Sequence, residues 1–234
     1  MPVEEYEGGT RRDAIGRIKE AEEKGDIETI VGIINYTMNL ATCGGSPDDV
    51  LDAWGTVARS ALDAFYRIMN SGSADSVELY SSEEYGNNYF DIIFFTLDSW
   101  WDKNERVGAA EAIVEAGLGC IVATCNNMDQ IKSKFSGCRY MIIDIVTLIV
   151  KKIMPKYQSE PSIQEQACLT LEVLAVSVYG TINTGIKESF QYYTKGEGYG
   201  FLKTQLVLAR DVITNKQKKA YPGRVAKTLG ISID

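Results

Sequence analysis

The fold is indicated most clearly by one stretch, Ile163-Gln-Glu-Gln-Ala-Cys-Leu-Thr-Leu-Glu-Val-Leu-Ala175. Its apolar residues recur at the spacing that forms one face of an α-helix. Similar patterns run through most of the chain, and only 5 of the 234 residues are proline. No Asn-Gly or Asp-Gly dipeptide joins alternating apolar runs, as a β-hairpin would require. The sequence therefore predicts an all-α protein.

Capping residues and Gly/Pro breaks set the expected helix boundaries. Thr10 with Asp13 and Ser162 with Glu165 fit the capping-box spacing, and Ser46 stands before Pro47 as an N-cap would. The glycines at 196, 198 and 200 lack the preceding strand and the spacing of a dinucleotide-binding loop, so we expect an ordinary connecting loop there. The predicted helices cover residues 10–24, 26–40, 46–70, 73–85, 89–101, 105–125, 128–135, 140–153, 162–179, 184–193, 201–214 and 216–229.

The helices recur in a regular order. The segment Ile131-Lys-Ser-Lys-Phe135 is echoed by Ile186-Lys-Glu-Ser-Phe190, and an Ala-rich helix precedes each of them. Recurrence at a fixed period is typical of stacked repeat proteins, in which neighbouring units share one core. We predict a single domain over residues 1–234, made of units at about 10–70, 73–125, 128–180 and 183–230. The alternative is an irregular all-helical globule in which the echoes arise by chance.

The Gln-Glu start of the 163–175 stretch, followed by Leu and Ala, resembles the third helix of the armadillo repeat. The resemblance implies a right-handed armadillo-like α-solenoid of about four three-helix units, in which the third helices line a concave face. The predicted units are longer than the roughly 40–47 residues of armadillo and HEAT repeats. The asparagine that armadillo importins use to hold peptide backbones is replaced by Val173 in one unit and Leu118 in another. This departure weighs against peptide binding of the importin type.

The composition excludes several kinds of chemistry. Histidine is absent, which removes Ser-His-Asp and Cys-His catalysis and zinc sites that need imidazole. Cysteines stand at positions 43, 120, 125, 138 and 168 without a CxxC pair, and we interpret all five as buried thiols in a reducing compartment. We expect no catalytic residues, no cofactor and no metal. The chain is predicted to be a non-enzymatic protein.

Charge is distributed unevenly along the chain. Residues 1–100 hold 7 basic and 19 acidic side chains, whereas residues 201–234 hold 7 and 2. An overall charge of -8 makes nucleic acid an unlikely partner. The first ten residues lack the apolar core of a secretory signal, and no run is long and apolar enough to span a membrane. We therefore expect a cytoplasmic protein.

One set of charged residues is a candidate binding surface. These residues fall on the face of the long third helices that points away from the apolar stripe. If such helices stack, their carboxylates would form a ladder along the concave face and orient a basic peptide or protein. The alternative is a solvated face without a partner. The candidate residues are Asp52, Arg59, Asp63, Glu111, Glu115, Glu165 and Glu172.

The basic end of the chain is a second candidate surface. It could bind an acidic partner, or the acidic amino-terminal half of another copy in a head-to-tail array. A weak patch for nucleic acid or anionic lipid is a third possibility. The residues concerned are Lys203, Arg210, Lys216, Lys218, Lys219, Arg224 and Lys227.

These features predict a protein-interaction scaffold or adaptor that binds a partner protein or peptide. Two alternatives bind nucleic acid through the basic carboxyl-terminal region. One is a HEAT-like helical-repeat DNA glycosylase, and the other is a helical nucleoprotein. The acidic amino-terminal half speaks against both.

Overall fold

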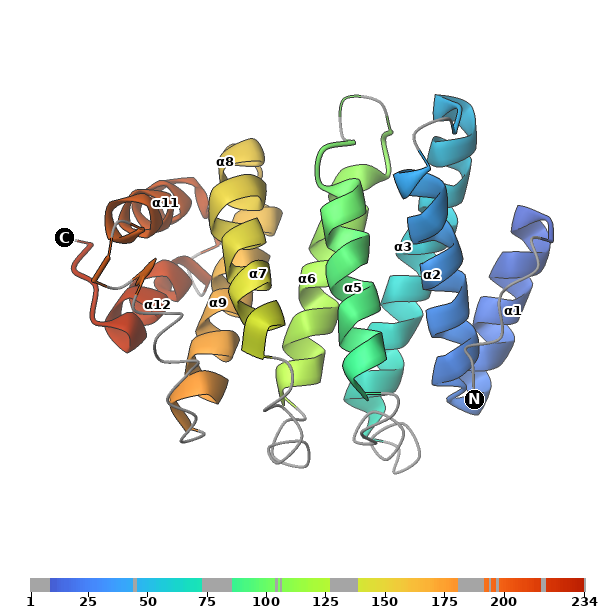
Figure 1. Cartoon of the computed structure of the whole chain (residues 1–234), viewed down its shortest axis with the longest axis horizontal. Coiled ribbons are helices and arrows are strands. Elements are labelled where there is room, and N and C mark those ends of the chain that lie inside the picture. The colour runs from blue at the N-terminus through green and yellow to red at the C-terminus, as the bar shows by residue number, and fades with distance from the viewer. Residues whose placement is uncertain are drawn as a thin grey trace. The chain divides into compact units, whose positions relative to one another are not determined.

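The computed structural model describes residues 9–43, 46–72, 86–103, 105, 107–126, 139–180, 192–193, 195–196, 198–215 and 218–233. Every regular element within these ranges is a helix, which confirms the all-α prediction for this part of the chain (Figure 1). The helices predicted at 73–85 and 128–135, and most of that at 184–193, lie outside the described residues. The chain divides into two compact units, Met1–Ile131 and Lys132–Asp234.

Unit 1 contains two helix pairs packed on one another, with a further helix against the first pair. Helices α2 and α3 pack together, α5 packs with α6, and the two pairs meet through α2 with α5 and α3 with α6. Helix α1 packs against both α2 and α3. The bounds are α1 Arg11–Lys24, α2 Ile27–Thr42, α3 Asp48–Ser71, α5 Gly86–Trp100 and α6 Ala110–Asn126.

Helices α3 and α6 run parallel. Gly55 faces Ala109, and further along both helices the Cys120 thiol donates to the Leu62 carbonyl oxygen at 3.2 Å. The approach is close, because a Cβ on Gly55 would lie 2.9 Å from the Ala109 Cβ. Glycine at position 55 thus permits α3 to approach the start of α6.

The α5–α6 contact likewise depends on a small residue. A Cβ on Gly117 would lie 2.7 Å from Leu97 Cδ2, which is closer than real Cβ contacts. Both Gly117 and Leu97 are buried. The glycine in this Ala-rich helix therefore serves close helix packing.

The capping box predicted at Thr10 is confirmed. Thr10 accepts a hydrogen bond from the Asp13 N–H, while the Asp13 carboxylate accepts from the Thr10 backbone. Gly25 ends α1 in the left-handed region at φ 68°, which favours glycine. Asp26 then caps α2 by accepting from the Thr29 N–H. The turn between α1 and α2 is thus fixed by local signals in the sequence.

Two other predicted caps are wrong. Helix α3 has Pro47 at its N-cap, and the Ser46 hydroxyl instead donates to the Leu40 carbonyl oxygen at 2.9 Å. In unit 2, helix α9 (Pro161–Gly180) begins at proline, so Ser162 lies inside the first turn. In α9 the fixed φ of proline and its missing N–H suit the first helical position, and they outweigh the serine signal.

Unit 2 begins with a helical segment that continues past its predicted end at Ile153. Helix α7 (Arg139–Leu148) leads into the π-helical turn η3 (Ile149–Ile153) and the short α8 (Met154–Lys156). Pro155 has no N–H for the usual bond one turn back. The preceding residue, Met154, bonds to the Ile149 carbonyl, five residues earlier. The wider turn allows the backbone to remain helical through the proline.

The other helices described in unit 2 are α11 (Tyr199–Val212), the 3-10 turn η4 (Lys218–Ala220) and α12 (Tyr221–Leu229). Helix α9 packs against α12 and α11, and α11 also contacts η3 and α8. Helix α12 starts five residues later than predicted. Pro222 fits the first turn of a helix but not its interior, which explains the later start.

The Gln-Glu start of α9 has a structural role. The Gln164 side chain is buried, and its Nε2 donates to the carbonyl oxygens of Met154 and Tyr157, both at 2.9 Å. These bonds satisfy backbone acceptors at the end of α8 that the helix leaves unpaired. One glutamine therefore holds the turn between α8 and α9.

Candidate functional site

The predicted binding residues of unit 1 come together along the line where α3 meets α6. Asp52 accepts a hydrogen bond from the Gly108 N–H at 3.0 Å, which joins α3 to the segment before α6. Helix α6 starts at Ala110 rather than at the predicted residue 105. Asp52 thus fixes the segment that precedes α6, while its side chain remains at the surface.

Arg59 is the main polar link between the two helices. Its Nη1 donates to the Ala112 carbonyl oxygen at 2.8 Å, and its Nε donates to Asp63 at 2.8 Å. Both ends of the Arg59–Asp63 pair are about one third exposed. The arginine fixes Asp63 on α3 and spans to α6 at the same time.

Two further carboxylates flank this link on α6. Glu111 is exposed and Glu115 is half-buried. Residues four apart lie on one face of a helix, and Ala112, which accepts from Arg59, lies between them in sequence. The surface that we call the acidic seam consists of Asp52, Arg59, Asp63, Glu111 and Glu115.

An exposed aromatic side chain borders the acidic seam. Tyr66 follows Asp63 by three residues and Arg59 by seven, which places it on the same face of α3. Its side chain is 43% exposed. Tyr66 is not among the residues predicted from the sequence, although helical spacing from Asp63 could have identified it. The acidic seam thus contains four carboxylates and one guanidinium group, and a tyrosine ring lies next to it.

Glu165 and Glu172, which belong to unit 2, are engaged inside that unit. Glu165 is only 9% exposed, and its carboxylate lies 2.8 Å from Lys218 Nζ. Glu172 pairs with Arg224 of α12 at 2.7 Å. Glu165 was predicted to present its carboxylate to a partner from the face away from the apolar stripe, but this side chain is buried, because η4 and α12 bring basic side chains onto α9.

The same contacts occupy part of the basic carboxyl-terminal end. Besides Lys218 and Arg224, Arg210 donates to the Ile233 carbonyl oxygen at 2.8 Å. Lys219 and Lys227 are exposed, whereas Lys216 lies outside the described residues. Several of the cations that could attract an external anion thus serve contacts within unit 2.

The buried cysteines are unsuited to nucleophilic chemistry. Burial raises the pKa of the Cys125 thiol to about 12, and it also raises the pKa of the Cys120 and Cys168 thiols. A thiol with a raised pKa stays protonated at neutral pH, whereas the thiolate is the nucleophile. Cys43 is exposed, so the expectation that it is buried was wrong. Cys138 lies outside the described residues.

The glycines of the 196–200 region pack closely against tyrosine. A Cβ on Gly198 would lie 2.7 Å from Tyr192 Cε1 and 2.9 Å from Tyr193 Cδ1. The Tyr193 hydroxyl is hydrogen-bonded to the Thr147 hydroxyl at 2.8 Å. Gly198 therefore allows α11 to start directly beside the tyrosine pair.

Comparison of the chain with protein-family models, curated proteins and solved structures gives no match. Within the described ranges, no cluster of three or more Cys, Asp or Glu side chains could hold a metal ion. None of the helices in those ranges has the length and apolar character needed to cross a membrane. The candidate binding site is therefore defined by the geometry of the acidic seam.

Proposed function

We propose that this protein is a non-enzymatic interaction module, a scaffold or adaptor that binds a partner protein through the acidic seam. The observation that carries the proposal is the double link made by Arg59, which holds Asp63 and the Ala112 carbonyl together. Because of this link, the carboxylates of two neighbouring helices keep a fixed spacing. A preorganised surface of this kind lowers the entropy lost on binding.

The chemistry of the seam suits a basic segment. Its four carboxylates outnumber its one guanidinium group, and Glu111 and Glu115 take part in no ion pair among the described residues. Lysine or arginine side chains of a partner would pair with these carboxylates, and the exposed Tyr66 ring could receive a cation over its face. Complementary charge of this type contributes mainly to specificity and to the association rate.

The proposal includes an architecture. We propose that the chain forms a right-handed armadillo-like α-solenoid, in about four units, with long helices such as α3 and α6 on its binding face. In unit 1 the α2/α3 pair packs against the α5/α6 pair, and α3 runs parallel to α6. This arrangement supports a repeat stack within unit 1. Neighbouring repeats in such a stack share one core.

The test uses isotope-labelled full-length protein and a synthetic peptide of alternating Arg and Ser. We expect backbone NMR shifts to change at residues 59–66 and 111–115, and the double variant Glu111→Gln/Glu115→Gln to weaken binding about tenfold. The control is Glu23→Gln/Asp144→Asn, which removes the same charge from exposed positions on α1 and α7 outside the seam. Changes spread over the surface, or equal weakening by the control, would refute the acidic seam as a binding site.

Nucleic-acid binding through the basic carboxyl-terminal region has less support. Lys218 and Arg224 already pair with Glu165 and Glu172, which reduces the positive potential available to a phosphate backbone. We expect the protein to pass through a heparin column at about 0.15 M salt. Retention there would instead favour the nucleoprotein or DNA glycosylase alternative.

Head-to-tail self-association is a further proposal. The remaining cations of residues 201–234 would contact the acidic half of a second copy. Light scattering at low and high ionic strength tests this directly. An average mass that falls as salt rises would support it, because screening weakens contacts between exposed charges. A mass that does not change with salt would exclude it.

A further inference from the structure

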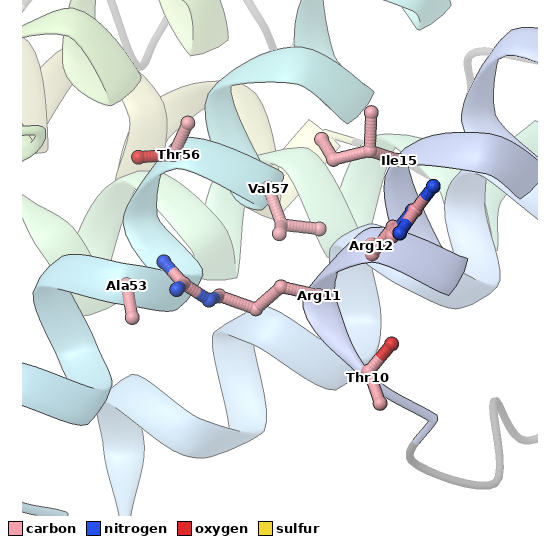
Figure 2. Close-up of a pocket in the computed structure, with 7 residues that line it drawn as sticks. All are labelled: Thr10, Arg11, Arg12, Ile15, Ala53, Thr56 and Val57. Atoms are coloured by element: carbon pink, nitrogen blue, oxygen red, sulfur yellow. The ribbon is translucent and has the colours of Figure 1, made fainter.

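A hollow of about 480 Å³ lies between α1 and α3 near the start of both helices (Figure 2). Its volume falls within the range of protein pockets that bind ligands. Helices α1 and α3 run parallel, since Arg11 lies near Ala53 at this end while Glu22 meets Arg67 at the other. The residues around the hollow are Thr10, Arg11, Arg12, Ile15, Ala53, Thr56 and Val57.

The floor of the hollow is apolar. Val57 is buried at 1% exposure, whereas Ile15 and Ala53 remain partly exposed. Figure 2 shows the Arg11 side chain extending from α1 toward Ala53 on α3, and Arg12 beside Ile15. An apolar floor with guanidinium groups at its edge is suited to a segment that presents both apolar and anionic side chains.

The two arginines lack a carboxylate partner within the described part of the chain. Neither Arg11 nor Arg12 takes part in an ion pair there. The nearest carboxylate in sequence, Asp13, is occupied by the backbone N–H and the hydroxyl of Thr10. Two cations thus border an apolar hollow without internal compensation.

The opposite end of the same helix pair shows the contrast. There Arg67 donates to both carboxylate oxygens of Glu22, so the guanidinium charge is compensated within the protein. This hydrogen bonding also lowers the pKa of Glu22. The guanidinium charge is therefore paired with a carboxylate at one end of the groove between α1 and α3 and, among the described residues, is not paired at the other.

We propose that the hollow between α1 and α3 is a docking site for an amphipathic helix of a partner protein, with leucine-like side chains against Ile15, Ala53 and Val57 and carboxylates paired with Arg11 and Arg12. Helices commonly bind by laying an apolar face into a groove of this type. Arginine forms bidentate hydrogen bonds with carboxylates, which would fix the orientation of the bound helix.

This site is separate from the acidic seam and prefers the opposite charge. Ala53, Thr56 and Val57 face α1, whereas Arg59 and Asp63 lie on the side of α3 that meets α6. One helix would thus serve two surfaces, each for a different kind of partner segment. Because the probes differ in charge, failure of one site would leave the other unaffected.

The experiment measures fluorescence anisotropy of labelled peptides of about fourteen residues, a length of about four helical turns. One peptide places Leu on one face and Glu on the other, a second carries Lys in place of Glu, and a third carries Ser in place of Leu. We expect the Leu/Glu peptide to bind at least about tenfold more tightly than either of the others.

Variants of the full chain locate the binding. Arg11→Ser/Arg12→Ser should weaken binding of the Leu/Glu peptide about tenfold, and Ala53→Glu should do the same by placing a carboxylate in the floor. The matched control is Lys151→Ser/Lys195→Ser, which removes two exposed cations from unit 2 outside the basic carboxyl-terminal end and should leave the affinity unchanged. Circular dichroism checks that each variant retains its helices.

Four results would overturn the proposal. The Lys peptide could bind as tightly as the Leu/Glu peptide. The Ser peptide could also match the Leu/Glu peptide, and that result would leave no role for the apolar floor. The Arg11→Ser/Arg12→Ser variant could keep full affinity. Finally, a short single-stranded oligonucleotide that binds more tightly than the Leu/Glu peptide, and is released by the same variant, would make the ligand a nucleic acid instead.

Discussion

Arg224 on α12 donates two hydrogen bonds to one carboxylate oxygen of Glu172 on α9, at 2.7 and 3.1 Å. The guanidinium group also lies 4.5 Å from the centre of the Tyr221 ring. The Glu172 side chain is only 18% exposed, so the pair is less accessible to solvent than a typical surface ion pair. It joins the carboxyl-terminal helix to the longest helix of unit 2.

Removal of Arg224 should therefore destabilise unit 2. We expect Arg224→Ala to lower the free energy of unfolding by about 1 kcal/mol, as found for partly exposed pairs with an added ring contact. Urea titration followed by circular dichroism measures the change. Lys227→Ala, an exposed position on the same helix, should change it by less than about 0.5 kcal/mol. Equal losses of unfolding free energy in the two variants would show that the pair with Glu172 contributes nothing to stability.

Gly117→Ala should destabilise unit 1. Alanine has the higher helix propensity by about 1 kcal/mol, but its Cβ would lie 2.7 Å from Leu97 Cδ2. Overpacking of this kind typically costs about 1–3 kcal/mol, so we expect a net loss. Gly16→Ala on α1 is the control, because no atom lies within 4 Å of the added Cβ. There the propensity term acts alone and the midpoint of thermal unfolding should rise. A rise in the thermal midpoint of both variants would mean that α5 moves away from α6 without loss of stability.

The cysteines should differ sharply in their reactivity toward a thiol reagent. In a Cys138→Ser background, Cys43 is exposed and should react at once, whereas Cys120, Cys125 and Cys168 are buried. Burial keeps these three thiols protonated, and only unfolding should expose them to the reagent. Spectrophotometric counting of released chromophore, with and without denaturant, checks this. Rapid reaction of more than one thiol in the folded protein would contradict the described packing.

Asp91→Asn should stabilise the protein at neutral pH. Asp91 Oδ1 is buried without a hydrogen-bond partner in the described part of the chain, and burial raises the pKa of this carboxyl group. The folded state then binds its proton more tightly than the unfolded state, so stability falls as pH rises above the ordinary value of 3.8. The difference in thermal midpoint between variant and wild type should vanish below that pH and grow above it. A difference independent of pH would point to packing instead.

Local signals made much of the fold predictable. The helices around Thr10, Ile27 and Asp48 follow from capping residues, apolar spacing and the glycine or proline breaks between them. Where two local signals compete, as at Pro161 and Ser162, the sequence does not show which one starts the helix. The π turn before Pro155 was also missed, because a proline in a helical pattern is expected to end the helix, whereas here a wider turn accommodates it.

The candidate site was predictable only in part. Asp52, Arg59 and Asp63 share a helix face by spacing alone, and the parallel packing of α6 brings Glu111 and Glu115 beside them. The environments of the two unit 2 glutamates depend on η4 and α12, whose Lys218 and Arg224 lie 53 and 52 residues further along the chain, and sequence spacing carries no such information. The hollow between α1 and α3 was missed for the same reason, since its walls come from two helices.

Helices α1, α3 and α6 point in the same direction, so the partial positive charges at their amino-terminal ends gather at one end of unit 1. Each of the three carries acid in its first turn, namely Asp13, Asp48 with Asp49, and Glu111. Part of the negative charge of the amino-terminal half therefore offsets aligned peptide dipoles inside the protein. A truncation that removed α1 would take away a dipole together with its counter-charge, and the change in field at that end of the unit would come mainly from the loss of Arg11 and Arg12.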